Sequence, residues 1–217
     1  MTAGDSTGWR HPAIKFLGFL LGGAAFGYAA GSLLGERLDG VFAEIAFDGS
    51  GLAAYLIALC YLVMGAIVGA GAAFPRLGAL ILNTYGEEEL REDRAKLLLG
   101  SATMILFGLA LLVMVLASAG SVQPVTAAVL FFGLLLASIV PYWPMLRRLD
   151  ELDRQLSHEA ISYTYYALLV FGGSWAALGH LELMRGPATL DWLSMFWGLM
   201  MVATFVAAGR RGLLDKS

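Results

Sequence analysis

Long stretches of apolar residues alternate with short polar segments along the chain. Crossing the hydrocarbon layer of a bilayer, about 30 Å thick, takes roughly 20 residues of α-helix. The stretches that reach this length lie at about residues 14–35, 52–74, 97–119, 125–146, 161–183 and 190–208. The pattern therefore predicts an all-α polytopic membrane protein, with six transmembrane helices arranged as hairpins in a single domain, residues 1–217.

The basic residues between these stretches predict how the protein is oriented. Lys and Arg accumulate in the cytoplasmic loops of membrane proteins. Of the 14 Lys and Arg residues, only Arg37 and Arg185 lie in the first, third and fifth loops, and the others lie in the second and fourth loops and the two terminal segments. We therefore expect both termini in the cytoplasm.

Glycines recur every four residues in the first predicted span. Where lipid removes the hydrophobic drive between helices, such a stripe lets another backbone approach closely. We expect the stripe to pack against the second span, which also has two glycines four residues apart, Gly65 and Gly69. The alternative is homodimerisation through this stripe. The stripe consists of Gly23, Gly27, Gly31 and Gly35.

A charged segment, residues 84–96, separates the second and third predicted spans. Thr84 and Glu87 have the spacing of a capping box, in which each side chain satisfies a free amide at a helix start. Glu92 and Lys96 form an i,i+4 pair in the favourable order. The segment therefore predicts a cytoplasmic helix that continues into the third span.

The fourth loop, residues 147–157, is a second charged segment with a similar pattern. Both segments contain an Asp-Arg step shortly before a span, and the second adds leucines at helical spacing, which need an apolar partner. That partner is either the neighbouring segment or another protein. We expect the two segments to bind a soluble protein through Glu88, Glu89, Arg91, Glu92, Arg94, Leu149, Glu151, Leu152, Arg154 and Leu156.

Three ionisable residues, His180, Glu182 and Asp191, lie near the opposite face of the predicted membrane. Ionisable groups in a span are candidates for function, and histidine changes charge near neutral pH. One interpretation is a proton or cation sensor on the outer face. The other is anchoring at the membrane edge, where these side chains reach water.

Composition excludes several classes of protein. Charged residues make up 14% of the chain, against about 25% in soluble domains. Cys60 is the only cysteine, which excludes an intramolecular disulfide, a CxxC redox pair and a cysteine zinc cage. Motifs for nucleotide phosphates, dinucleotides and zinc hydrolysis are absent. We therefore expect no enzyme activity, no cofactor and no metal site.

Three stretches of the C-terminal third resemble a group of small bacterial inner-membrane proteins. They are LDELDR at 149–154, which precedes a span, DWLSMFW at 191–197 and GRRG at 209–212. In that group a Met/Leu-Asp-Glu-Leu-x-Arg stretch precedes a transmembrane hairpin. Its members are frequently encoded beside short helix-turn-helix regulators, so the resemblance implies an inner-membrane inhibitor that sequesters a transcription factor.

These observations lead to two main hypotheses. The first is a non-enzymatic membrane regulator that binds a soluble cytoplasmic protein, with no direct contact to nucleic acid. The second is a transporter or channel accessory for a small solute, suggested by the repeated hairpins and the glycine-rich first span. A lipid-modifying enzyme using His180, Glu182 and Asp191 would lack both a nucleophile and a metal set.

Overall fold

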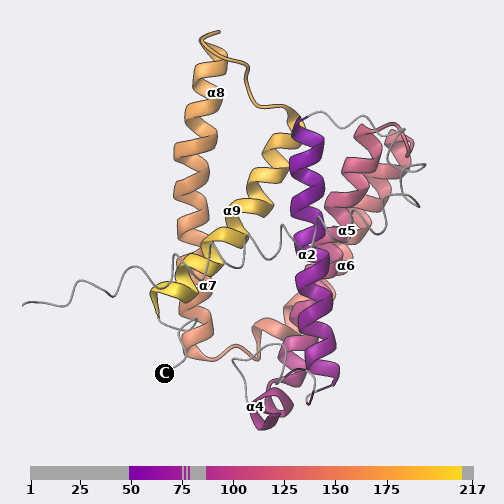
Figure 1. Ribbon diagram of the computed structural model, residues 1–217, viewed down its shortest axis with the longest axis vertical. Helices are drawn as coiled ribbons and strands as arrows, with labels where there is room; N and C mark the ends of the chain where they lie inside the picture. Colours follow the sequence, from indigo (N-terminus) through magenta and orange to yellow (C-terminus); the bar gives the residue numbers. More distant parts are fainter. Residues whose placement is uncertain (1–48, 75, 77, 79–86, 212–217) are drawn as a thin grey trace, which may run out of the picture. The chain divides into compact units, whose positions relative to one another are not determined.

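The computed structural model describes residues 49–74, 76, 78 and 87–211 (Figure 1). The first predicted span, with Gly23, Gly27, Gly31 and Gly35, lies outside the described residues. The chain divides into two units, of which Phe47–Ala208 holds nearly all described residues. The other unit, Met1–Ala46 with Gly209–Ser217, contributes only residues 209–211 to the described part.

The described part of the chain is helical and contains no strand. Four of its helices are long and apolar enough to cross a membrane: α2 (Gly49–Ala73), α5 (Arg94–Ser118), α6 (Pro124–Leu146) and α9 (Thr189–Arg210). They coincide with the second, third, fourth and sixth predicted spans. This finding confirms a membrane protein of the all-α class, while the count of six spans and the orientation stay predictions.

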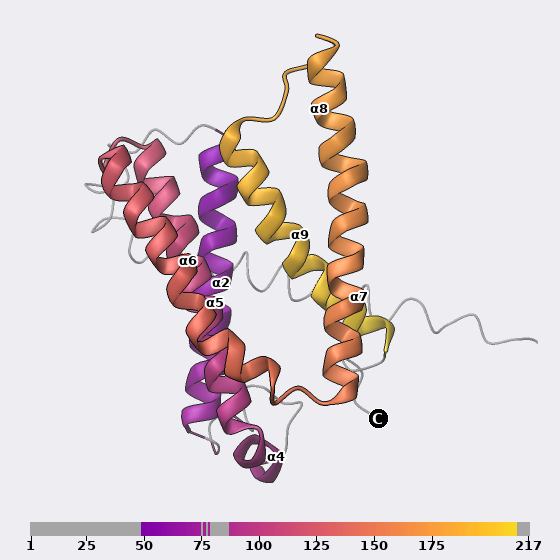
Figure 2. The same ribbon diagram turned by 180° about the vertical axis from the view of Figure 1, so that it is seen from behind.

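The fifth predicted span, residues 161–183, overlaps three consecutive helical segments. These are α7 (Glu151–Ala167), the π-helical turn η1 (Leu168–Gly172) and α8 (Gly173–His180). They follow one another without a break and form a single rod (Figure 2). The rod ends at residue 180, three residues before the predicted end of the span.

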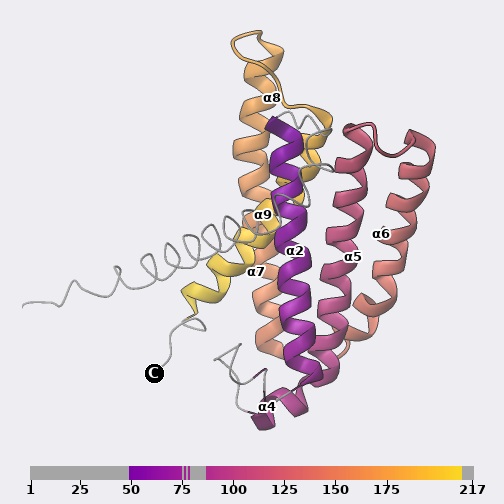
Figure 3. The ribbon, with the colours of Figure 1, turned by 45° about the vertical axis from the view of Figure 1, so that its right-hand side comes forward.

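Helix α5 packs against α2 on one side and α6 on the other (Figure 3). Glycines make the contact between α2 and α5 close. A Cβ atom at Gly65 would lie 2.8 Å from Cγ1 of Ile105, and one at Gly69 would lie 2.9 Å from Oγ of Ser101. These two glycines of the second span therefore contact the third span.

Helix α9 crosses from the amino-terminal end of α2 to α7 (Figure 2). Its first half, including Trp197, packs against the buried Ala54 and Ala58 of α2, and the Tyr61 hydroxyl donates to the Trp197 carbonyl at 3.0 Å. Its second half places Ala203 and Ala207 against Ala160 of α7. Small residues at this second contact let the two helices approach closely.

The outer face of α6 is apolar and exposed. Val125, Leu136 and Val140 are 76%, 67% and 74% exposed. In water this surface would be strongly unfavourable, at about 25 cal/mol per Å² of apolar area. Its exposure is explained if the face contacts the hydrocarbon of a bilayer.

The charged segment before α5 differs from its prediction. Helix α4 (Glu87–Glu92) ends one residue before Asp93, and α5 starts at Arg94. The predicted continuous helix through residues 84–96 is therefore wrong, because the chain turns at Asp93. Thr84, the predicted cap, lies outside the described residues.

Candidate functional site

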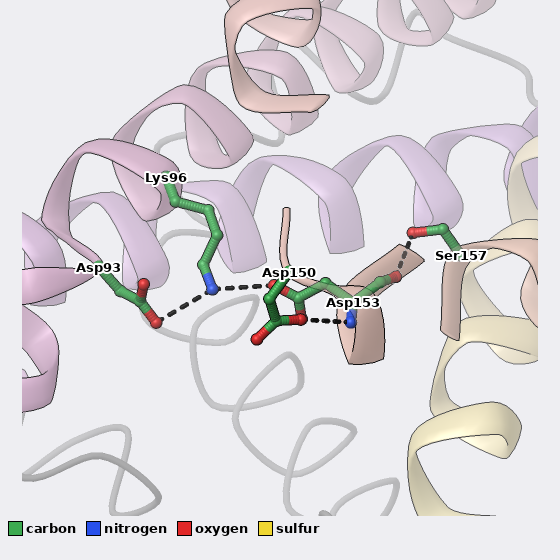
Figure 4. Close-up of polar contacts among 5 residues, drawn as sticks. All are labelled: Asp93, Lys96, Asp150, Asp153 and Ser157. Carbon is green, nitrogen blue, oxygen red and sulfur yellow. Dashed lines mark hydrogen bonds and ion pairs between the residues drawn. The ribbon is translucent and has the colours of Figure 1, made fainter. Parts of the chain in front are cut away.

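The starts of α5 and α7 are joined by a lysine that binds two aspartates (Figure 4). Nζ of Lys96 lies 3.0 Å from Oδ2 of Asp93 and 2.9 Å from Oδ2 of Asp153. The Lys96 side chain is 18% exposed, so solvent screens these contacts less than at an open surface. The two Asp-Arg steps of the sequence thus meet at one ammonium group. The i,i+4 spacing predicted Glu92 as the partner of Lys96 instead.

Asp150 fixes the start of α7. Its Oδ1 accepts a hydrogen bond from the backbone amide of Asp153 at 2.7 Å. This bond satisfies one of the free amides of the first helical turn. One turn later, the Ser157 hydroxyl donates to the Asp153 carbonyl at 2.9 Å (Figure 4). The cap places the Asp153 carboxylate in the first turn, within reach of Lys96.

The cap also corrects the predicted helix at 147–157. Because α7 starts at Glu151, Leu149 lies in the connection before the helix and is not part of a helical leucine stripe. Leu156 packs with Tyr163 against the cluster of Ala160, Ala203 and Ala207. Its apolar partner is therefore α9, and only Leu152, which is 43% exposed, has a largely open side chain among the three leucines.

The charged residues predicted to bind a partner are close in sequence to the residues of the Lys96 bridge. Those of α4 and the start of α5 precede Lys96 in the chain, and those of α7 flank Asp153. The side chain of Glu89 lies outside the described part. The exposed members are Glu88, Arg91, Glu92, Arg94, Glu151 and Arg154. We call these six side chains, together with Leu152, the α4–α7 surface.

The three ionisable residues at the other end of the rod have separate local roles. Asp191 lies in the first turn of α9, and its Oδ2 accepts from the Ala188 amide at 2.7 Å. This contact resembles one half of a capping box. Glu182 has a left-handed backbone, with φ of 58°, in the turn that ends α8. His180 is exposed at the last residue of α8.

Glu182 occupies the position that usually requires glycine in a Schellman turn. Its amide donates to the Gly179 carbonyl at 3.1 Å, and the Leu183 amide donates to the Leu178 carbonyl at 3.1 Å. Gly120, with φ of 77°, occupies the equivalent place after α5. Two helices of this chain thus end with the same turn, one on glycine and one on glutamate.

A cavity of about 530 Å³ lies where α2 and α9 begin. It was not predicted, although Asp191 is one of its lining residues. No spacing in the sequence connects Trp175, Arg185 and the start of α2. The cavity is lined by Gly49, Ser50, Ala53, Ile57, Trp175, Arg185, Gly186, Asp191, Ser194, Met195, Gly198 and Leu199. His180 and Glu182 are not among its lining residues.

Comparison with known proteins yields no match to a family model, to a curated protein or to a solved structure. The resemblance to small bacterial inner-membrane proteins therefore stays a prediction. Within the described ranges, no group of three or more His, Cys, Asp or Glu side chains is placed to hold a metal ion.

Proposed function

We propose that this chain is a non-enzymatic membrane regulator that binds a soluble cytoplasmic protein through the α4–α7 surface. The observation that carries the proposal is the Lys96 bridge, since it holds the two charged segments beside each other. The excess of Lys and Arg in these loops supports a cytoplasmic location for this surface. The resemblance to small bacterial inner-membrane proteins suggests the bacterial inner membrane as the location. It also suggests a small helix-turn-helix transcription factor as the partner.

Leu152 supports a binding role for this surface. It follows Glu151 and precedes Asp153 and Arg154, so it lies outside the apolar part of the rod. Contact with hydrocarbon explains exposed leucines in the middle of a span, but not one among charged residues. Covering such a side chain with a partner contributes about 1.5–3 kcal/mol when burial is complete.

The charges suit a partner that carries both signs. The surface presents Glu88, Glu92 and Glu151 together with Arg94 and Arg154. Complementary charges speed association and select among partners more than they increase affinity. We therefore expect binding to weaken at high salt, with Leu152 as the apolar contact that remains.

Site-specific photocrosslinking in native membranes tests this proposal. A photoreactive residue replaces Leu152 on the surface or, as a control, Val129, which is 68% exposed on α6. We expect a crosslinked soluble protein at position 152 only, and its loss when Arg154→Glu is added. Glu182→Gln, at the other end of the rod, should leave the crosslink intact. Absence of any protein crosslink at 152 would refute the proposal.

The alternative, a transporter or channel accessory for a small solute, is supported by the cavity between α2 and α9. The cavity extends from Ser50 to Ile57 and from Asp191 to Leu199. At the helical rise per residue, each stretch is about 10–12 Å long. A transporter would open this region to both sides of the membrane. In a Cys60→Ser background, Leu199→Cys should then react with impermeant thiol reagents added to either side, whereas a regulator allows reaction from one side only.

A further inference from the structure

The loop that lines one end of the cavity between α2 and α9 is held to α8. Nε1 of Trp175 donates a hydrogen bond to the Arg185 carbonyl at 2.8 Å. Gly179 and Gly186 pack backbone to backbone, since a Cβ atom at Gly179 would overlap Cα of Gly186. With the Schellman turn at Glu182, these contacts fix the backbone of Arg185, an exposed residue that lines the cavity.

Two opposite charges line this cavity without neutralising each other. Arg185 forms no ion pair with any described residue, Asp191 included. Asp191 uses Oδ2 for the Ala188 amide, at 2.7 Å, which leaves Oδ1 for another donor. The lining of the cavity therefore includes one basic and one acidic residue. A ligand with a single charge satisfies only one of them.

The other walls are mainly apolar and lie deeper. Ile57 is seven residues beyond Ser50 on α2, and Leu199 is eight residues beyond Asp191 on α9. Both therefore lie about 10–12 Å further along their helices. Met195 and Ala53 line the space between these levels. Charge at the rim and apolar side chains below match a molecule with a polar head and a hydrocarbon tail.

We propose that the cavity binds a zwitterionic aminophospholipid, with the phosphate on Arg185 and the primary ammonium on Asp191. The start of an acyl chain occupies the space beside Ile57, Met195 and Leu199. A guanidinium matches phosphate oxygens in bidentate geometry, and an ammonium donates to a carboxylate. Small-molecule sites have volumes of about 300–1,000 Å³. The cavity volume of about 530 Å³ is in this range, so it takes the head and part of one chain. This site goes beyond the proposed function and does not depend on it.

Native mass spectrometry of the full chain in detergent tests the proposal. The probes are phosphatidylethanolamine, phosphatidylglycerol and phosphatidylcholine with identical acyl chains, and soluble phosphoethanolamine. We expect phosphatidylethanolamine to bind about tenfold more tightly than the other two lipids, the effect of one charge-assisted contact. Phosphatidylglycerol lacks the ammonium, and phosphatidylcholine has no N–H to donate. Phosphoethanolamine without the tail should bind more weakly than the whole lipid.

Variants connect the preference to the cavity. Arg185→Gln should weaken phosphatidylethanolamine binding about tenfold. Asp191→Asn keeps an acceptor for the Ala188 amide but should abolish the preference over phosphatidylglycerol. Ala53→Phe, at an exposed residue of the wall, should block the tail, whereas Ala128→Phe on the exposed face of α6 should change nothing.

Three results would overturn the proposal. They are equal affinity of the wild type for all three lipids, undiminished phosphatidylethanolamine binding in both Arg185→Gln and Ala53→Phe, and phosphoethanolamine binding as tightly as the lipid. The photocrosslink at position 152 tests the regulator proposal independently. A negative result for lipid binding would therefore not contradict the regulator proposal.

Discussion

Lys96 and Asp153 form an ion pair of 2.9 Å, although 57 residues separate them in the sequence. The pair joins the start of α5 to the start of α7. Nζ of Lys96 also forms a second ion pair, at 3.0 Å, with Oδ2 of Asp93. Without the ammonium group, two carboxylates would face each other in a partly buried setting. The bridge therefore determines whether the two charged segments form one surface.

Replacing Lys96 should loosen this junction. Lys96→Met removes two charge-assisted contacts and leaves two like charges, so we expect a loss of about 1 kcal/mol of stability. For a chain of this size, that lowers Tm by about 2–4 °C. Thermal unfolding in detergent measures it, with the exposed Arg94→Met as the matched control. Combined with Asp153→Asn, the loss should be less than the sum of the single variants. Strictly additive losses would show that the pair does not interact.

Two leucines of α7 should respond differently to serine. Leu156→Ser removes an apolar contact with the α7–α9 cluster, so we expect a destabilisation of about 2–4 kcal/mol. Leu152 has a side chain that is 43% exposed. Leu152→Ser should therefore change stability by less than about 0.5 kcal/mol. The measurement is the midpoint of unfolding in a denaturing detergent. If Leu152→Ser proved equally damaging, this residue would belong to the packed interior and not to the binding surface.

Glycine at position 182 should stabilise the end of α8. A left-handed backbone is unfavourable for residues with a Cβ atom and ordinary for glycine. Glu182→Gly should therefore raise stability by about 0.5–1 kcal/mol. The reverse change at the equivalent turn, Gly120→Ala, should lower it by a similar amount. Tm values of the variants and the wild type measure these changes. A Glu182→Gly variant with a lower Tm than the wild type would contradict the prediction and show that the Glu182 carboxylate itself stabilises the fold.

The α2–α5 contact should not tolerate a side chain at Gly65. Gly65→Leu places atoms where Ile105 and the Ser101 backbone already lie. Overpacking of this kind typically destabilises by about 1–3 kcal/mol. Gly133 is the matched control, since nothing lies within 4 Å of a Cβ built there. Gly133→Leu should express and unfold like the wild type. Size-exclusion profiles and unfolding midpoints compare the two, and equal tolerance would contradict the close helix contact.

Apolar length was enough to predict most of the described fold. The predicted span at 125–146 matches Pro124–Leu146, and that at 97–119 matches Arg94–Ser118, because a bilayer requires a minimum length of apolar helix. Gly65 and Gly69 do lie close to another helix, but that helix is α5, whereas the glycine pattern predicted the first span.

The local patterns were less informative at the charged segments and at the cavity. Counting i,i+4 pairs predicted an unbroken helix before α5, but the partner of Lys96 is Asp153, from another part of the chain. Asp191 was selected together with His180 and Glu182 because all three are ionisable. In the structure it lines the same cavity as Arg185 and Trp175, through a loop fold that no spacing reveals.

The π-helical turn η1 determines which way the α8 part of the α7–α8 rod faces. Thr164 contacts Met200 and Gly172 contacts Trp192, so both face α9. At about 100° per residue, eight steps of regular α-helix would leave these two positions about 80° apart. The single extra residue of a π turn removes most of that difference. Deleting Phe171 would therefore preserve the salt link at Asp153 but rotate Trp175 by about a quarter turn. Trp175 would then no longer hold the Arg185 loop beside the cavity between α2 and α9, whereas the Lys96 bridge would remain intact.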